Sequence, residues 1–374
     1  MRKAAYIGIG GFARKIRKAY VGVNGVARRI KKVYIGIGGV ARPCWSGGNT
    51  LGYYGETTAL ANGKSRLAAA TIGDYALFAG GYSGSARVAT VDAYSKSLTR
   101  STPTALYTER DNLAATTVGD YALFGGGYSG SSQVVIVDAY NRSLTQSVPT
   151  RLTVYRDCLA ATAVGNYALF GGGYNGSTHV VTVEAYNQSL TRSTVGTGLS
   201  VARYKLSATT IGIAALFAGG YSSSGKVATV DAYDTSLTRS TPAALSEARY
   251  ALAAATVGDF ALFVSGSNGS TNTTAVDAYN RYLTRTTPTE VSVGSYGLAA
   301  TTLGNYALFG GGNNNGSYLS KVNAYDDALT RTEPTSLSVA RFDFAATTVG
   351  NYALFAGGTK SPGTANTVDV YTLN

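Results

Sequence analysis

The sequence has little histidine, cysteine or charge. Of its 374 residues one is His and two are Cys, and only 14% are Asp, Glu, Lys or Arg. The lone His179 leaves almost no material for a His-rich metal site or for Ser-His-Asp catalysis. Cys44 and Cys158 are no disulfide framework. We therefore expect a protein that is not an enzyme and that uses no cofactor and no metal.

Long apolar runs are also missing. The N-terminus lacks the continuous apolar core of a signal peptide. No stretch approaches the ~18 apolar residues that a membrane helix needs. We expect no membrane span and no signal peptide, so that export would occur by lysis or within a larger particle.

Glycine and tyrosine are abundant, with 47 and 28 copies, and they recur in a fixed pattern. The tripeptide Ala-Leu-Phe occurs seven times at a spacing of 46 residues, or 47 where an extra residue enters the 194–199 segment. Such self-similarity predicts a repeat fold. The phenylalanines of the seven copies are Phe78, Phe124, Phe170, Phe217, Phe263, Phe309 and Phe355.

Each copy divides into four β-forming runs, which in the second copy are 113–117, 121–124, 134–140 and 144–148. Four short strands between Gly, Asn and Ser turns are typical of a propeller blade, and an alanine-rich first run suits the crowded innermost position. We predict an all-β fold with a seven-bladed β-propeller over residues 47–374.

The repeats resemble Kelch motifs. A glycine pair such as Gly126-Gly127 follows the second run, Tyr140 and its equivalents end the third, and an Arg precedes the first. Leucines such as Leu144 stand where Kelch repeats usually carry Trp. The resemblance covers residues 52–374 and implies a propeller, but propellers host many functions. The copper centre of galactose oxidase, another Kelch-type propeller, needs two His ligands, and this chain has one His.

The last copy stops at Asn374, after its third run. The missing fourth run lies near the other end of the chain, because residues 52–57 align with 98–103. We predict that 52–57 forms the outer strand of the last blade. Closing the ring in this way removes an open sheet edge.

The positive charge is concentrated in residues 1–46, a segment that we call the head. The formal net charge is +12, and eleven of the 32 basic residues precede the first acidic residue, Glu56. Three 14-residue repeats start at Tyr6, Tyr20 and Tyr34, each around a turn-favouring pair. We predict small basic β-hairpins that contact an anionic partner. The candidate contacts are Arg14, Lys15, Arg17, Lys18, Arg28, Arg29, Lys31 and Lys32.

The head resembles short repeats at the start of tail-associated proteins of phages and prophages of Gram-positive bacteria. The resemblance covers residues 6–42 and implies association with particle proteins, in the virion or in the host cytoplasm before assembly. Isolated hairpins are marginal in water. We therefore expect the head to gain order by homo-oligomerising or by docking on a partner.

A basic residue precedes the first run in six of the seven copies and could suggest an anion funnel. Only one copy lacks it, at Ser295, and the same copy has Asn323 where the others carry an acid in the third run. The joint loss favours one ion pair per blade, because an unpaired buried charge is costly. We expect Arg249→Ala to destabilise the fold more than Arg239→Ala, on an outer strand.

Two other sets of positions differ between copies, one after that basic residue and one after the glycine pair. Both belong to loops at the same end of an up-and-down blade, so we expect them at one mouth of the channel, which we call the rim. Tyrosines and amides suit sugars or protein loops, although polar loops without a ligand would have the same composition. The candidate rim residues are Arg66, Tyr82, Asn112, Tyr128, Tyr174, Tyr204, Lys205, Tyr221, Tyr250, Tyr296, Asn313, Phe342 and Asp343.

These observations lead to two main hypotheses about the function. The first is a phage or prophage structural protein whose head anchors it in a tail or particle and whose rim binds a host-surface glycan or protein. The second is a nucleic-acid-associated protein whose head contacts phosphates, although the head lacks the aromatic stacking platform expected of a single-strand binder. A hydrolase without a recognisable site is a distant third.

Overall fold

The computed structural model describes residues 50–373 and, before them, the backbones of six strands. These six pair as three antiparallel hairpins, as predicted for the head. The expected turn pairs 10–11, 24–25 and 38–39 lie outside the described residues. The hairpin strands are β1 (Tyr6–Ile9) with β2 (Phe12–Lys15), β3 (Ala19–Val23) with β4 (Val26–Ile30), and β5 (Lys32–Ile37) with β6 (Val40–Ser46).

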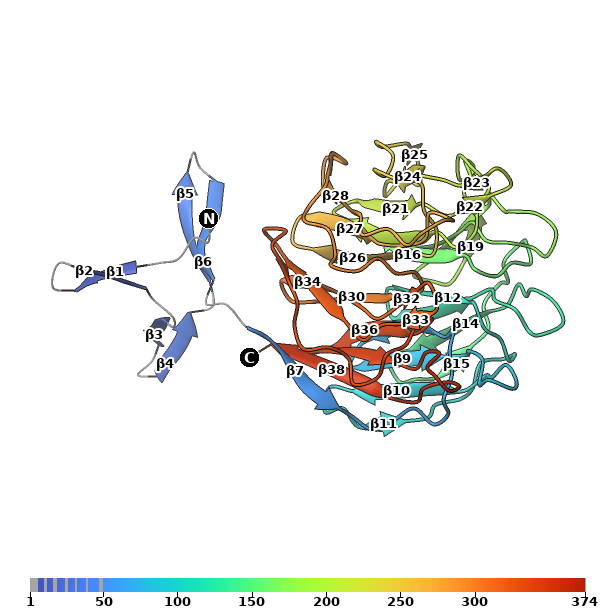
Figure 1. Cartoon of the computed structure of the whole chain (residues 1–374), viewed down its shortest axis with the longest axis horizontal. Helices are drawn as coiled ribbons and strands as arrows, with labels where there is room; N and C mark the ends of the chain where they lie inside the picture. Colours follow the sequence, from blue (N-terminus) through green and yellow to red (C-terminus); the bar gives the residue numbers. More distant parts are fainter. Residues whose placement is uncertain are drawn as a thin grey trace. The chain divides into compact units, whose positions relative to one another are not determined.

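The chain divides into two compact units, residues 1–51 with 374, and residues 52–373. The second unit holds seven four-stranded antiparallel sheets and, among the described residues, no helix (Figure 1). The fold is therefore the predicted seven-bladed β-propeller. The innermost strands are β8 (Ala68–Ile72), β12 (Ala114–Val118), β16 (Ala160–Val164), β20 (Ser207–Ile211), β26 (Ala253–Val257), β30 (Ala299–Leu303) and β36 (Ala345–Val349).

The other strands follow outward in each blade. The second strands are β9 (Tyr75–Ala79), β13 (Tyr121–Gly125), β17 (Tyr167–Gly171), β21 (Ala214–Ala218), β27 (Phe260–Val264), β31 (Tyr306–Gly310) and β37 (Tyr352–Ala356). The third are β10 (Val91–Ser95), β14 (Val137–Asn141), β18 (Val183–Asn187), β24 (Val230–Tyr233), β28 (Val276–Asn280), β34 (Val322–Asp326) and β38 (Val368–Leu373). The outermost are β11 (Arg100–Ser101), β15 (Gln146–Ser147), β19 (Arg192–Thr194), β25 (Arg239–Ser240), β29 (Arg285–Thr286), β35 (Arg331–Thr332) and β7 (Leu51–Glu56).

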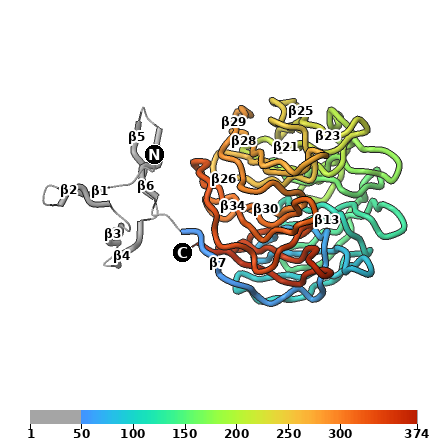
Figure 2. The backbone as a smooth tube through the Cα atoms, in the orientation of Figure 1, coloured from blue at the N-terminus to red at the C-terminus, as the bar shows by residue number. Residues whose placement is uncertain are grey.

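The ring closes as the sequence predicts. In blade 7 the strand order is β36-β37-β38-β7, so the first strand of this unit is the outer strand of its last blade. Figure 2 shows β7, in blue, running beside the red C-terminal strands. Blades 1 to 6 follow in chain order from β8. Tyr53 on β7 packs edge-on against Tyr371 and donates a 2.6 Å hydrogen bond to Asp369.

Two strand predictions were too long. The third strand of blade 2 begins at Val137 rather than Val134, because the Val134 N–H bonds Gly127 in the loop instead of joining the ladder. The fourth strand has two residues, and Leu144 lies in the turn before it at φ 60°. Its side chain packs against the core between blades 2 and 1. The turn geometry and this packing end the strand early.

The core lies between neighbouring blades. One cluster joins Leu77 and Val91 of blade 1 to Phe124 and Tyr140 of blade 2, and comparable clusters fill other junctions. The buried tyrosine of each third strand donates its hydroxyl to the connection that enters the blade, as Tyr140 does to the Thr104 carbonyl at 2.7 Å. Each blade is thus buried on both faces.

Alanine and threonine line the axis. The innermost strands are small-residue strands, as predicted, and threonine hydroxyls bond carbonyls of the preceding blade, for example Thr117 to Thr71 at 2.8 Å and Thr256 to Thr210 at 2.7 Å. Between them an axial cavity of about 410 Å³ is lined mainly by Ala and Thr. These contacts tie adjacent blades together at the centre of the ring.

Candidate ligand-binding rim

The basic residues before the first strands form buried ion pairs, as predicted, and line no anion funnel. Arg249 contacts Asp277 at 2.7 Å, and both side chains are 0% exposed. Arg249 also donates to the Phe263 carbonyl, and Asp277 accepts the Ser246 N–H, so the pair joins three segments of the blade. The equivalent pairs are Lys64–Asp92, Arg110–Asp138, Arg156–Glu184, Arg203–Asp231 and Arg341–Asp369.

Blade 6 replaces both members of the pair by neutral groups. The Ser295 hydroxyl donates to the Gly311 carbonyl at 3.2 Å, and Asn323 accepts from Arg331 at 2.8 Å. Burial lowers the pKa of the Arg110 guanidinium in blade 2, against the opposing effect of Asp138. Because burial disfavours a charge, a lone member of such a pair is unfavourable, which accounts for the joint loss in blade 6.

The residues two positions after these basic residues, and after Ser295 in blade 6, encircle the axis. In each of the seven, the backbone N–H bonds the carbonyl of the equivalent residue in the preceding blade, at 2.6–3.1 Å, and the ring is complete. All seven have φ between 50° and 65°. We call them the inner ring: Arg66, Asn112, Cys158, Lys205, Ala251, Gly297 and Asp343.

The second predicted set lies directly beside the first. In every blade, the residue before the inner-ring position forms a β-bridge with the residue after the glycine pair. The sequence therefore placed both sets at the same mouth correctly. The bridges are Ser65–Tyr82, Asp111–Tyr128, Asp157–Tyr174, Tyr204–Tyr221, Tyr250–Ser267, Tyr296–Asn313 and Phe342–Thr359.

The rim contains a third variable row, which was not predicted from the sequence. In five blades a residue five positions after the rim position bridges back to it, and in blades 4 and 6 the same pairing forms short hairpins, β22 (Tyr221–Ser222) with β23 (Gly225–Lys226) and β32 (Asn313–Asn314) with β33 (Ser317–Tyr318). All seven residue types differ, a signal that aligning the copies could have revealed. We call this row the outer row: Arg87, Gln133, His179, Lys226, Asn272, Tyr318 and Thr364.

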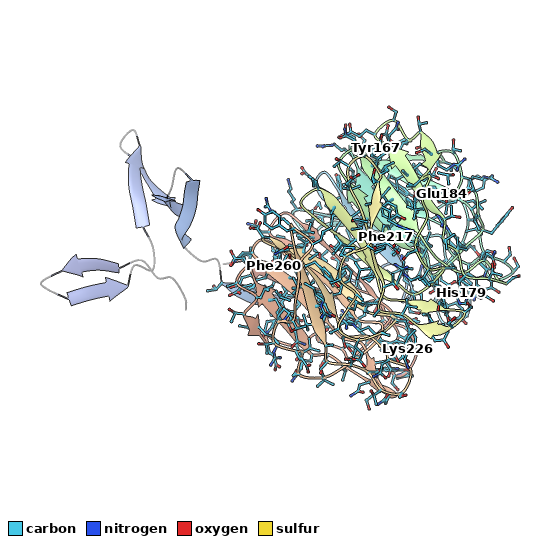
Figure 3. The ribbon with its side chains drawn as sticks, turned by 90° about the horizontal axis from the view of Figure 1, so that it is seen from above. Tyr167, His179, Glu184, Phe217, Lys226 and Phe260 are labelled. Carbon is cyan, nitrogen blue, oxygen red and sulfur yellow. The ribbon has the colours of Figure 1, made fainter. Side chains whose placement is uncertain are left out.

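Figure 3 places two members of the outer row, His179 and Lys226, on one side of the molecule, away from Tyr167 and Phe260. Tyr167 and Phe260 begin second strands, at the opposite ends of their blades. The variable rows therefore occupy one face of the propeller.

Aromatic rings dominate the rim of blades 3 to 5. Tyr174 lies 5.8 Å from Tyr204, which lies 6.0 Å from Tyr221, which in turn lies 5.4 Å from Tyr250, measured between ring centroids. His179 joins them at 5.3 Å from Tyr204. We call these five residues the aromatic arc. Burial raises the pKa of Tyr204, although the nearby Lys205 opposes this.

Charges dominate the rim of blades 1 and 2. The guanidinium of Arg87 lies over both Tyr82 and Tyr128, at 5.1 and 4.9 Å from the ring centroids. Arg66 lies over Tyr82 at 4.8 Å. Both arginines pair with the buried carboxylate of Asp111, at 3.2 Å for Arg66 and 3.5 Å for Arg87. Two partly exposed arginines thus share one buried carboxylate here.

Not every predicted rim residue is free to touch a ligand. Asn313 is 5% exposed, and its side chain accepts the Gly316 N–H at 2.7 Å within its hairpin. The hydroxyls of Tyr82, Tyr128 and Tyr174 donate to glycine carbonyls of their own loops. Asn112 is half-buried in the inner ring. These groups shape the rim, whereas Lys205 and Tyr221 present exposed surface.

Burial raises the pKa of the Asp343 carboxyl, and Lys205 and Arg66 oppose this effect. Burial also raises the pKa of Asp157.

Within residues 50–373, no group of three His, Cys, Asp or Glu side chains is arranged to hold a metal ion. The part of the chain that the structure describes has no helix long and apolar enough to span a membrane.

No protein-family model matches the chain, and no curated protein matches it. Solved structures do match. The propeller titled "Structure of YjhT" is 14% identical, covers 71% of this chain and 95% of its own, and aligns with a TM-score of 0.58. At this identity the likeness shows the fold alone.

Proposed function

We propose that the propeller is a non-enzymatic binding module whose ligand sits on the rim. The observation that supports this is the contrast between a repeated scaffold and a variable face. The buried phenylalanines and tyrosines and their contacts recur in every blade, whereas the inner ring and the outer row differ from blade to blade. A single ligand on the axis contacts each blade differently, so variation is expected there.

Backbone conformation supports the same proposal. Six inner-ring residues other than Gly297 adopt φ of 50–54°, where a side chain costs about 1 kcal/mol relative to glycine. The leucines equivalent to Leu144 also have positive φ, but their side chains pack against the core. Arg66 and Lys205 are partly or fully exposed and lie over rim tyrosines instead of packing against the core. The retention of side chains at this cost on the rim supports a role in binding.

The rim chemistry suits a host-surface glycan or a protein loop. Tyrosine rings offer apolar faces with polar edges, and both ligand classes use them. The aromatic arc spans three adjacent blades, which is enough surface for an extended ligand. The Kelch features of the repeats are compatible with this proposal but name no ligand.

Replacing Tyr204, at the middle of the aromatic arc, with alanine is expected to weaken binding at least about tenfold, because central aromatic anchors contribute most to binding. A glycan array and a pull-down from host-surface extracts, both with the full chain, measure this. Tyr282→Ala is the matched control, since Tyr282 is 90% exposed in the turn between β28 and β29. Equal retention of both variants would count against a rim site.

We further propose that the head anchors the chain in a phage or prophage particle. The 14-residue basic repeats and their hairpin pairing support this. The alternative is a head that contacts nucleic-acid phosphates, favoured by eleven basic residues in 46.

Deleting residues 1–46 is expected to abolish incorporation into purified particles, because the head carries the proposed anchor. Immunoblotting of purified particles compares the full and shortened chains. Unchanged incorporation contradicts the anchor. Binding of the full chain to DNA that falls steeply with salt and is lost with the head supports the nucleic-acid alternative instead.

A further inference from the structure

A cavity of about 440 Å³ opens on the rim at the junction of blades 7 and 1. Arg66 and Tyr82 of blade 1, with Phe342, Asp343 and the 359–364 loop of blade 7, line it, and Tyr318 of blade 6 completes the wall. We call it the junction pocket. It lies within the proposed binding face but is separate from the aromatic arc of blades 3 to 5.

The pocket exists because blade 7 carries short side chains both in the outer row and at the position after the glycine pair. At other junctions a long outer-row side chain reaches the loop of the next blade, as Arg87 does at Gly130 and Gln133 at Gly176. Blade 7 has Thr364 at this position, whose hydroxyl donates to the Ser83 carbonyl at 3.1 Å. Thr359 likewise stands where blades 1 to 4 carry tyrosine. The space that longer side chains would fill stays open.

Two cations line the pocket. The Arg66 side chain is 31% exposed, and its Nη1 atom pairs with Asp111 while the guanidinium lies over Tyr82. Lys360 is half-buried in the 359–364 loop, and none of the described carboxylates lies within ion-pair distance of it. Both residues line the same pocket, and an ammonium without an acidic partner together with a partly exposed guanidinium favours an anionic group.

The remaining lining favours a ring with hydroxyl groups. Phe342 and Tyr318 pack together at 4.9 Å between centroids and offer apolar surface. The carboxyl group of Asp343 also lines the pocket and can accept a hydrogen bond from a ligand hydroxyl or N–H. A volume of about 440 Å³ is within the range of small-ligand sites.

We propose that the junction pocket binds an anionic sugar residue, with its carboxylate, phosphate or sulfate between Arg66 and Lys360. This rests on the proposed function of the rim and gives its ligand a chemical class. Arg66 orients the anion from a fixed position, since Asp111 and Tyr82 hold its side chain. Lys360 supplies the second contact, and Asp343 discriminates by accepting from a neighbouring hydroxyl.

The test is a glycan array probed with the full chain, using matched glycans that differ only in a carboxylate, phosphate or sulfate group. The wild-type chain is expected to retain the charged member of a pair at least about tenfold better, since each charge-assisted hydrogen bond contributes strongly. Which charged group is retained identifies the source of the anion. Equal or better retention of the neutral members overturns the proposal.

Two variants keep the test independent of folding. Lys360→Ala removes the unpaired ammonium, and Thr364→Gln fills the pocket with the neutral side chain that blade 2 has at this position, Gln133. Both are expected to lose about tenfold or more in retention of charged glycans. Lys96→Ala is the control and should change nothing, since Lys96 is an exposed lysine in the turn between β10 and β11, outside the rim. Unchanged retention by both pocket variants overturns the site.

The outcomes separate this proposal from the proposed function. Retention of neutral glycans or proteins that depends on Tyr204 but not on Lys360 leaves the rim as a binding face and rejects the junction pocket. No retention of any glycan or protein rejects both.

Discussion

Replacing Arg249 with alanine is expected to lower the free energy of unfolding by about 3–5 kcal/mol. The variant leaves the Asp277 carboxylate without its partner where the side chain is 0% exposed. Arg285 also reaches Asp277, at 3.2 Å, but from a partly exposed outer strand, so it compensates only in part. Denaturant-induced unfolding followed by tyrosine fluorescence measures the change.

The matched control lies in the same blade. Arg281 pairs with Asp259 at 2.7 Å, but both side chains are more than 60% exposed, and such pairs contribute less than about 1 kcal/mol. Arg281 is a cleaner comparison than Arg239, which contacts Asp231 at 3.7 Å and donates to the Gly198 carbonyl. Equal losses of stability for Arg249→Ala and Arg281→Ala would mean that a buried pair contributes no more to stability than an exposed pair.

A double variant tests the neutral pattern of blade 6. Arg249→Ser with Asp277→Asn reproduces the residues of Ser295 and Asn323, and it leaves no fully buried unpaired charge, since Arg285 is partly exposed. We expect it to be more stable than Arg249→Ser alone, because the desolvation penalty of a lone carboxylate is absent. A double variant that is less stable than the single one would contradict this explanation of the joint loss.

The sequence predicted the features that internal repetition makes visible. Seven Phe-containing copies gave the number of blades, and the alignment of 52–57 with 98–103 gave the closing strand, found as β7. The ion pairs were predicted because one copy lost both members together. Each of these inferences compares copies within one chain, and the fold places equivalent residues in equivalent environments.

Contacts between blades could not be predicted in the same way. The junction pocket depends on how far Thr364 reaches toward Ser83 across the closure, which no single repeat specifies. The stacking of Arg87 on the tyrosines of two blades likewise requires the spacing of adjacent loops. The short outer strands and the positive φ of Leu144 were not predicted, because strand propensity alone does not show which side chains pack into the core.

Removing the closing strand is expected to cost on the order of 5 kcal/mol and to make the protein aggregate. A chain beginning at residue 58 loses β7, and with it the ladder to β38 and the contacts of Tyr53 with Tyr371 and Asp369. This figure combines the lost backbone hydrogen bonds, at about 1 kcal/mol each, with the apolar burial lost where Tyr53 packs on Tyr371. The loss is comparable to the total stability of many domains, ~5–15 kcal/mol.

A chain beginning at residue 50 is the matched control, because it lacks the head but keeps β7. Denaturant unfolding and size-exclusion chromatography compare the two. The shorter chain should unfold at lower denaturant and elute partly as aggregates, since β38 then exposes unpaired N–H and C=O groups along a full strand. Coincident unfolding curves would mean that the ring is held by its blade-to-blade contacts alone, and that β7 covers an edge without closing the fold.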